Sequence, residues 1–445
     1  MVGGELFRTL LGFLLRSIDG FPDPRRGRNT QYSMRDIALS AFGVFFCQSP
    51  SFLAYQRLMQ QAQGTNNAHT LLGVQHLPTD NHIRALLDTV DPMNLQAAFG
   101  DTFALLREQQ VVESFRSFGN TLLVALDGTG YFRSETLHCP QCSVAHHAKD
   151  RVVYTHTVLM AAVVRPGGGQ VLALEPEFLG PQDGHEKQDC ESAAAKRWIA
   201  RVGALLSPLG LTLLGDDLYA NVPMIQQAEA HELDYIFVAK ESSHKHLYQE
   251  IRSLAKLGEL KSCTGTQGRG KAFRRLRYRF LNGVSLTGEA STVQVNWVER
   301  VSYDAQGKRT SRKAFVTNHR ITETNAEAVV AAGGCRWKIE NEDFNTLKTK
   351  GYHFEHNFGH GRQYLSQTLL SLNILAFLFH TVLELLDERC AAVRQMLPRR
   401  DTFFQHLSAL TQYLPFADLP SLLEFMLRGL RDGPGPPPQS FPIRL

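Results

Sequence analysis

The sequence has little cysteine, little excess charge of either sign and none of the composition of disorder. The 445 residues include seven cysteines, an odd and scattered set that forms no disulfide framework for a chain of this size. Lysine and arginine number 47 against 43 for aspartate and glutamate, so overall charge does not by itself indicate a nucleic-acid-binding protein. Hydrophobic residues make up 43% and charged residues 20%, which excludes a disordered or fibrous chain. The length predicts two or three domains. The scattered cysteines predict a reducing, cytoplasmic compartment.

Two apolar segments have the composition of a membrane or signal sequence. The longest, residues 369–386, is interrupted by three polar side chains, Asn373, His380 and Glu384, and we interpret it as a buried helix. Residues 1–20 have apolar side chains at helical spacing, but no small-residue cleavage site follows them. We therefore expect a soluble protein with no signal peptide and no membrane partner.

The N-terminal region, residues 1–120, has a helical pattern of apolar residues. Within residues 69–90 we expect a short helix, a Leu-Pro turn and a second helix capped by Thr79 or Asp80. Two such helices form either a helix-turn-helix, with Arg84 near the start of a recognition helix, or a corner of a helical bundle. On the first interpretation, residues 1–120 are a helical DNA-binding domain.

Short apolar strands begin after residue 120. The run NTLLVALDG ends near Asp127, and the run GLTLLG ends just before Asp216. Both are typical of buried strands that carry a polar residue at the carboxyl end. Further strands alternate with helices up to residue 241, so residues 121–241 predict a mixed α/β core.

The alternation of strands and helices stops at residue 242. Polar and apolar residues alternate instead, as in half-buried antiparallel strands, and predict a β-rich insertion over residues 242–320. Helical patterns return afterwards. We predict the second part of the core over residues 321–364, a helical region over 365–432 and a disordered tail over 433–445.

Three carboxylates stand out in this organisation: Asp127 and Asp216 at strand ends, and Glu340 on a helix after the insertion. Each Asp taken alone is more often a turn or cap residue than a ligand. However, ligand sites in open α/β sheets lie at the carboxyl ends of strands, where both Asp side chains would meet. Convergent carboxylates favour Mg²⁺ or Mn²⁺. Two such ions about 3.5–4 Å apart support in-line attack on a phosphodiester.

The motifs around these residues are LLVALDGTGYF, LLGDDLYAN and RWKIENEDFNTLK. This ordered set resembles the DDE transposases of bacterial insertion sequences, over essentially the whole chain and including the β-rich insertion. The resemblance implies an RNase H-like core in which Asp127, Asp216 and Glu340 hold two Mg²⁺ ions. It also implies double-stranded DNA as partner (terminal inverted repeats and target DNA), a homodimer on DNA, and a cytoplasmic, nucleoid-associated protein in bacteria.

The family pattern also separates neighbouring acidic residues. It places the second Asp three residues before a Tyr, here Tyr219, which selects Asp216 over Asp217. The chain departs from the pattern where Gly333 replaces a Tyr and Leu347 replaces a Lys. These departures affect the phosphate-binding role expected of the helix and not the metal-binding role of Glu340.

Two cations share the helix with Glu340. Arg336 and Lys348 fall on its stripe at multiples of four, which suits phosphate contact. The alternative is a plain Arg336–Glu340 ion pair at the surface.

The densest basic cluster lies in the β-rich insertion. On a strand, Arg275, Arg277 and Arg279 share one face, which suits a DNA backbone and makes affinity depend on salt. The alternative is a solvated strand face. We expect Trp297, in the same region, to belong to the core.

One further set contains Cys139 and Cys142, in a C-x₂-C spacing, with His146 nearby. This set is compatible with structural zinc, but a second ligand pair at the usual spacing is absent, which argues against a zinc site. The acidic residues 183–191 are interpreted as the favourable start of a helix.

Together these features predict a DNA transposase that cleaves insertion-sequence ends and transfers their strands. One alternative is a metal-dependent nuclease that hydrolyses DNA without strand transfer. Another is a catalytically inactive, zinc-bearing DNA-binding protein.

Overall fold

The computed structural model describes residues 3–26, 30–148, 150–181, 190–288 and 293–432. The tail predicted over residues 433–445 and the acidic residues 183, 186 and 189 lie outside these ranges. The chain divides into two compact units, which we describe separately. The helical unit comprises Met1–Val111, Gly130–His156 and Asn345–Leu445, and the sheet unit comprises Val112–Thr129 and Thr157–Phe344.

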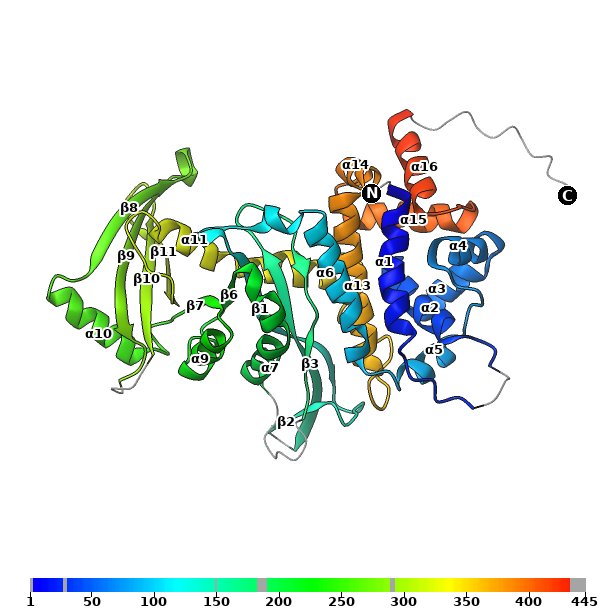
Figure 1. Ribbon diagram of the computed structural model, residues 1–445, viewed down its shortest axis with the longest axis horizontal. Coiled ribbons are helices and arrows are strands. Elements are labelled where there is room, and N and C mark those ends of the chain that lie inside the picture. Colours follow the sequence, from blue (N-terminus) through cyan, green and yellow to red (C-terminus); the bar gives the residue numbers. More distant parts are fainter. Residues whose placement is uncertain (1–2, 27–29, 149, 182–189, 289–292, 433–445) are drawn as a thin grey trace. The chain divides into compact units, whose positions relative to one another are not determined.

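The helical unit is organised around one long helix, α13 (Leu365–Leu386). By length and composition α13 could cross a membrane, but 83% of its apolar window is buried within the protein. It packs against α1, α2, α5, α6 and α14, and in Figure 1 it runs beside α1 and α6. The predicted buried helix is therefore confirmed. The helices of this unit are α1 (Gly3–Ile18), α2 (Met34–Phe46), α3 (Phe52–Gln60), α4 (Ala62–Leu72), α5 (Asp80–Leu87), α6 (Gln96–Glu108), α12 (Asn345–Thr349), α13, α14 (Glu388–Met396), α15 (Arg400–Tyr413) and α16 (Leu419–Asp432).

Two strands pass through both units. β1 (Leu122–Ser134) and β3 (Arg151–Val164) begin or end in the helical unit, where β2 (Ser143–His147) pairs antiparallel with β3. β1 is longer than the sequence indicated, because it continues past the glycines at 128 and 130. Asp127 therefore lies within a strand and not at its end.

The sheet unit contains one continuous sheet in the order β3-β1-β6-β7-β11-β10-β9-β8. β1, β6 and β7 pair in parallel, and the strands from β7 to β8 pair antiparallel. This mixed α/β core with helical terminal regions is the architecture that the sequence predicts. The remaining strands are β4 (Leu172–Ala173), β5 (Glu177–Leu179), β6 (Leu211–Gly215), β7 (Asp234–Val238), β8 (Lys261–Gln267), β9 (Arg274–Ser285), β10 (Gln294–Tyr303) and β11 (Arg309–Thr317), and the helices are α7 (Glu191–Trp198), α8 (Ala204–Leu206), α9 (Val222–Ala230), α10 (Lys245–Lys256) and α11 (Ala326–Gly334).

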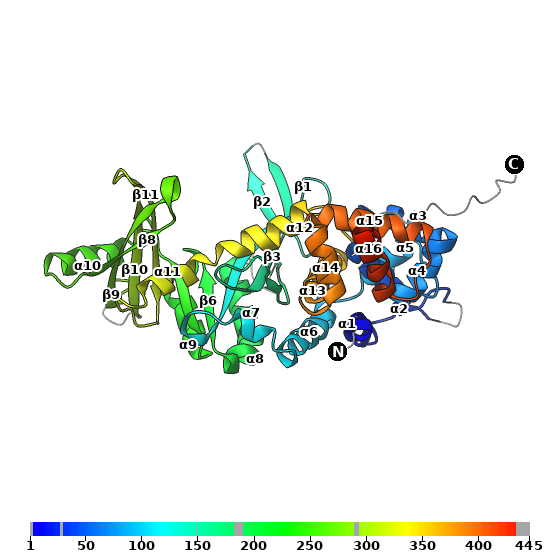
Figure 2. The same ribbon diagram turned by 90° about the horizontal axis from the view of Figure 1, so that it is seen from above.

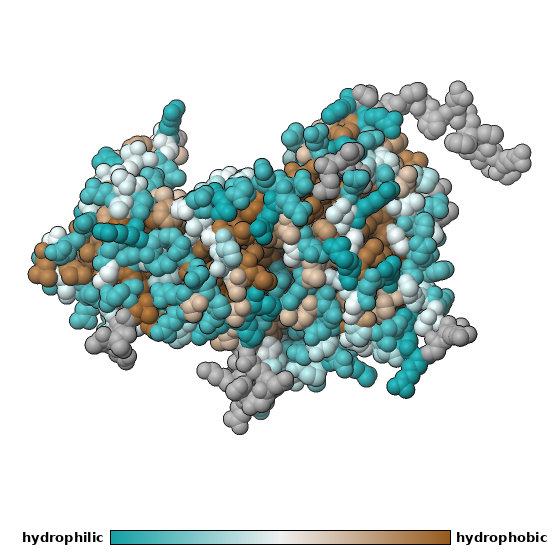
Figure 3. All heavy atoms as spheres, viewed as in Figure 1, coloured by the Kyte–Doolittle hydropathy of each residue, from teal (hydrophilic) through white to brown (hydrophobic). Residues whose placement is uncertain are grey.

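The β-rich insertion extends the core sheet. β11 pairs with β7 through Phe315, Val316 and Thr317, so the insertion strands continue the same hydrogen-bonded ladder. α10, which the sequence did not indicate, packs on β9 (Figure 2). Trp297 is 1% exposed and meets the Tyr248 ring edge-on, which confirms it as a core residue. The surface over β8 and β9 is mostly hydrophilic (Figure 3).

Candidate carboxylate site

The strand register brings Asp127 and Asp216 to the same level of the sheet. β1 and β6 are parallel neighbours, and Ala125 pairs with Leu214. Each Asp lies two residues further along its strand direction, and neighbouring strands are about 4.8 Å apart. β6 ends at Gly215, so Asp216 begins the turn that leaves the sheet. The two carboxylates therefore belong to one edge of the parallel core.

Arg336 joins Glu340 to this edge. Its Nη1 donates to Glu340 Oε1 at 2.8 Å and lies 3.5 Å from Asp127 Oδ2. Only 9% of the Arg336 side chain is exposed, so this is not the surface ion pair considered from the sequence. The guanidinium also lies over the Trp337 ring, with its carbon 4.9 Å from the ring centroid. Arg336 therefore holds the Glu340 carboxylate beside Asp127.

The acidic neighbours of these residues have other contacts. Asp216 Oδ1 accepts from the backbone N–H of Leu218 at 2.8 Å, which fixes its carboxylate in the turn. Asp217 instead accepts from the backbone N–H of Lys240 at 2.6 Å and lies 3.2 Å from His244 Nε2. The geometry thus separates Asp216 from Asp217 in the way the family pattern does.

A fourth carboxylate, Glu191, lies in the same site. Its Oε1 accepts from the hydroxyl of Tyr219 at 2.7 Å, and Tyr219 is fully buried. The sequence suggested only a helix start for Glu191. The signal that could have found it is Gly128: a Cβ there would overlap the Glu191 carboxyl group. A glycine directly after the first Asp therefore leaves room for another acidic side chain.

Burial and mutual repulsion perturb these acids. Burial raises the pKa of Asp127 to about 7, Arg336 opposes this shift, and the negative charges of Glu191, Glu340 and Asp216 add to it. Burial also raises the pKa of Glu191, opposed by the hydrogen bond from Tyr219. Strongly perturbed carboxyl groups that share a cleft are typical of functional sites.

The donor set fits a hard divalent cation. The Asp127 carboxylate is repelled by three other carboxylates, those of Glu191, Glu340 and Asp216, and the Arg336 guanidinium offsets part of this repulsion. A bound cation would add positive charge and relieve it further. Oxygen ligands of this kind are those that Mg²⁺ and Mn²⁺ prefer. Asp127, Asp216 and Glu340 are the residues that would hold the ion.

A cavity of about 500 Å³ opens beside Asp216 within the sheet unit. Arg336 and Trp337 line it on one side, and Trp337 is 47% exposed. Lys313 also lines it, with Nζ 5.8 Å from the centre of the Trp337 ring. Cationic and aromatic side chains together suit phosphates and bases.

The three arginines of β9 share one face, as expected, but differ in their contacts. Arg275 and Arg277 are exposed. Arg279 is half-buried and donates through Nε to Glu299, which is fully buried in β10, at 2.9 Å. Arg279 therefore stabilises the sheet by pairing with Glu299, whereas the exposed Arg275 and Arg277 can contact a partner.

Arg84 and Lys348, two other residues expected to contact DNA, form contacts within the helical unit instead. Arg84 lies 3.2 Å from Asp80 Oδ2 and donates to the Phe358 carbonyl at 3.0 Å. Lys348 pairs with Glu355 at 2.8 Å. Lys348 falls on the stripe of Glu340 only in an uninterrupted α-helix, whereas a π-helical turn, Ile339–Phe344, precedes α12 and changes the spacing.

The cysteine pair has different histidine neighbours from the one expected. His146 is exposed on β2 and lies outside the cluster that the described residues form. Cys139 and Cys142 instead meet His156 and His360. All four belong to the helical unit.

Comparison with known proteins assigns the family. A family model described as Transposase DDE domain matches residues 122–378, more than half of the chain. The chain belongs to the DDE transposase family. The matched range includes the carboxylate site, with Asp127, Asp216 and Glu340 in the order that the sequence indicated.

The other comparisons add little to this assignment. No curated protein matches the sequence. Among solved structures, the chain is similar to the piggyBac transposase synaptic complex with hairpin DNA, determined by cryo-EM. The identity is 11% and the TM-score 0.38, over 98% of this chain and 84% of that chain. The family assignment of this transposase therefore rests on the family model.

Proposed function

We propose that this transposase cleaves the ends of a mobile DNA element and joins them to target DNA in a reaction that depends on Mg²⁺ or Mn²⁺. The observation that carries the proposal is that Asp127 and Glu340 meet at the buried Arg336, with Asp216 close enough for its charge to act on Asp127. Divalent cations held by these carboxylates would supply a Lewis acid at the scissile phosphate and would activate an oxygen nucleophile, water or a 3′-hydroxyl.

The protein's own groups prepare the site for this chemistry. Arg336 orients Glu340, and the hydrogen bond from Tyr219 orients Glu191. The backbone N–H of Leu218 fixes Asp216. Because these partners are themselves buried or part of a turn, the carboxylates are held in place before substrate arrives, which lowers the cost of organising the transition state.

The DNA would be bound by the exposed basic face of β9 and by the cavity beside Asp216. Arg275 and Arg277 suit phosphate contacts, and Trp337 offers a ring face to a base. Two element ends must be processed together, so we expect a homodimer on double-stranded DNA. We place the protein in the bacterial cytoplasm, associated with the nucleoid when bound.

The test is cleavage of end-bearing DNA by Glu340→Gln and by its neighbour variant Glu342→Gln. Glu342 is two residues away and half-buried. Both variants therefore replace a glutamate by glutamine on the same helical turn, and they differ only in which carboxylate is lost. We expect Glu340→Gln to bind DNA but to lose nicking in Mg²⁺, and Glu342→Gln to keep both. Equal nicking by both variants would remove Glu340 from the site.

A joining assay separates transposition from simple hydrolysis. A pre-cleaved end with a free 3′-hydroxyl is offered with a supercoiled target plasmid. Transposition predicts covalently joined products in Mg²⁺ that disappear in Asp127→Asn. Nicking of the end without joining would favour a nuclease, and neither activity with intact DNA binding would favour an inactive DNA-binding protein.

A further inference from the structure

We propose that Cys139, Cys142, His156 and His360 bind one structural zinc ion in the helical unit. The facing ligand atoms of these four residues all lie within 4.8 Å of one another. The two Sγ atoms are 3.9 Å apart. His156 Nε2 lies 3.5 Å from Cys139 Sγ and 3.4 Å from Cys142 Sγ, and His360 Nε2 lies 3.6 Å from Cys142 Sγ.

These separations are the edges of a zinc tetrahedron. Zinc binds thiolate sulfur at about 2.3 Å and imidazole nitrogen at about 2.0–2.1 Å. Tetrahedral angles then require about 3.8 Å between two sulfurs and about 3.6 Å between sulfur and nitrogen. The sulfur–sulfur edge and the three sulfur–nitrogen edges lie within a few tenths of an ångström of these values. The other two edges, from Cys139 to His360 and between the two histidines, are no longer than 4.8 Å. Four of the six edges therefore match a single zinc ion, and the remaining two need at most a small closure around it.

The four proposed ligands come from three separate segments of the chain. Cys139 and Cys142 belong to a tight turn before β2, closed by the Cys142 N–H to the Cys139 carbonyl at 3.1 Å. His156 lies on β3, where that strand faces the turn. His360 comes from the loop between α12 and α13, 218 residues from Cys142.

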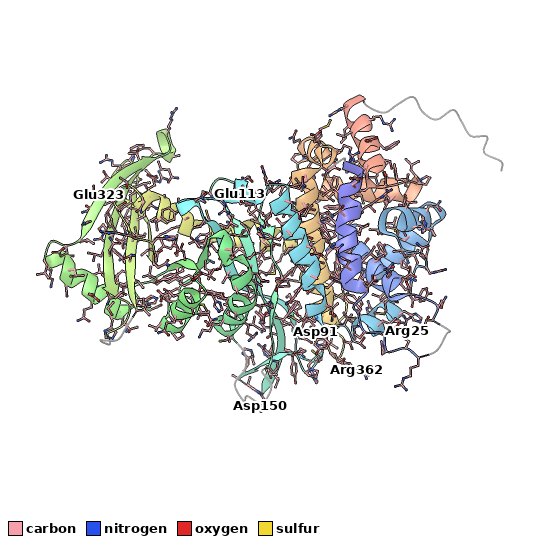
Figure 4. The ribbon with its side chains drawn as sticks, in the orientation of Figure 1. Arg25, Asp91, Glu113, Asp150, Glu323 and Arg362 are labelled. Carbon is pink, nitrogen blue, oxygen red and sulfur yellow. The ribbon has the colours of Figure 1, made fainter. Side chains whose placement is uncertain are left out.

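The loop that carries His360 is itself fixed. The Asp88 carboxylate accepts from the backbone N–H groups of Arg362, at 2.9 Å, and Gln363, at 2.9 Å. It also accepts from Leu365 N–H at 3.1 Å. In Figure 4, Arg362 marks this loop and Asp150 marks the far end of the hairpin formed by β2 and β3. His360 is therefore presented to the cysteines by a backbone held at several points.

The surroundings indicate a closed, structural site. Cys139, Cys142 and His156 are 9%, 2% and 1% exposed. Tyr131 stacks on His156 with ring centroids 5.6 Å apart, and Phe132 lies 4.3 Å from the His360 ring centroid. Four protein ligands in an aromatic enclosure leave no open coordination position, which is the arrangement of structural zinc. Two sulfur and two nitrogen ligands also favour zinc over Mg²⁺.

The ion would tie the hairpin of β2 and β3 to the segment that precedes α13. Such a cross-link between distant parts of the chain stabilises the fold, because the unfolded chain does not hold the ligands together. The site uses none of the carboxylates proposed for catalysis, so its test does not depend on transposase activity.

The experiment measures zinc in the full-length protein, purified through an affinity tag that does not bind metal. We expect about one zinc per chain that survives dialysis against EDTA and is released by a thiol-modifying reagent. Cobalt exchanged into the site should give the intense visible bands of tetrahedral coordination together with thiolate charge-transfer absorption. Zinc-free protein that takes up no cobalt in this way would overturn the proposal.

Variants identify the ligands. Cys142→Ser and His360→Ala should lose or weaken zinc binding, and the cobalt spectrum should change in each. Cys263→Ser, a cysteine on β8 outside the cluster, is the matched control and should keep one zinc per chain. Full zinc content in Cys142→Ser would contradict the assignment. If that variant is insoluble, the cobalt spectra of the wild-type protein and of His360→Ala still decide it.

Discussion

Glu191 shows what a single side chain adds to the carboxylate site. From the sequence it is one of several acidic residues before a helix, a position where negative charge is favourable without any further role. In the structure it is held by Tyr219 and contributes to the raised pKa of Asp127. Sequence order selects Asp127, Asp216 and Glu340 as candidates because a family pattern joins them. Glu191 has no such pattern, and only the packing of the start of α7 against β1 reveals it.

Gly128→Ala tests this packing. The added Cβ would overlap the Glu191 carboxyl group and come within 3.1 Å of its Cγ, so Glu191 must leave its place beside Tyr219. Displacing a positioned group by about 1 Å costs up to roughly a hundredfold in rate, and we expect a loss of tenfold to a hundredfold in DNA nicking. Gly130→Ala is the control, because a Cβ there meets nothing closer than 3.9 Å. Nicking unchanged in Gly128→Ala would mean that Glu191 does not support the site.

Asp343 predicts a pH dependence of stability. It is fully buried, and within the described ranges neither carboxyl oxygen has a hydrogen-bond partner. Burial raises its pKa from 3.8 to about 8, so the folded state keeps a proton that the unfolded state releases. Its contribution to stability is therefore greatest at low pH and is lost as pH rises towards 8, by about 1.4 kcal/mol per pH unit at most.

Urea unfolding between pH 5 and pH 8 measures this effect in Asp343→Asn and the wild-type protein. The variant should lose less stability as pH rises, since asparagine cannot ionise. Glu342→Gln, on the same turn but less buried, should follow the wild-type curve. Parallel curves for Asp343→Asn and wild type would show that Asp343 has no raised pKa.

At the scale of elements, periodicity predicted the strands that carry the site and failed where the signal was weak. The apolar run GLTLLG corresponds to β6, and the alternating pattern over residues 242–320 corresponds to a region that contains β8 to β11. β8 has a polar sequence, KSCTGTQ, and stays in place as the edge strand paired to β9. The apolar run that predicts β1 ends near Asp127, whereas the strand itself continues to Ser134 because pairing with β3 extends the ladder.

The exposed face of β9 yields a prediction about DNA affinity. Arg275→Ala with Arg277→Ala should weaken DNA binding and reduce the slope of log affinity against log salt by roughly 2, because each phosphate that an arginine neutralises adds about 0.9 to that slope. Arg16→Ala, an exposed arginine on α1 that pairs with Asp101, removes a charge elsewhere and should leave the salt slope unchanged. Equal slopes for the double variant and wild type would exclude this face from the DNA interface.

At the scale of the whole molecule, the two compact units are not continuous segments of the sequence. The expected N-terminal and C-terminal helical regions pack together as one unit with a segment from the middle of the chain. The histidine that completes the proposed zinc site lies 218 residues from its cysteine partner. Local patterns predict helices and strands well but carry no information about such long-range partners. The sequence therefore points to His146, which is near the cysteines along the chain, and not to His156 or His360.

This packing predicts that residues 1–111 do not fold alone. Phe42 meets Phe379 of α13 with ring centroids 5.4 Å apart, and Phe46 meets His380 at 4.5 Å. Without α13 these rings would be exposed. We expect the isolated fragment to show no cooperative thermal transition by circular dichroism, and co-expression with residues 345–432 to increase its solubility. A cooperative transition in the fragment alone would establish an independent N-terminal domain.

The central claim is that Asp127, Asp216 and Glu340 share a divalent cation. The most direct measurement is anomalous diffraction from crystals of the protein grown with Mn²⁺ and end DNA. We expect a manganese peak within coordination distance of the Asp127 and Asp216 carboxylates, with Glu340 completing the site and the peak lost in Asp127→Asn. Manganese bound elsewhere, with these three carboxylates free of metal at a concentration that supports cleavage, would contradict it.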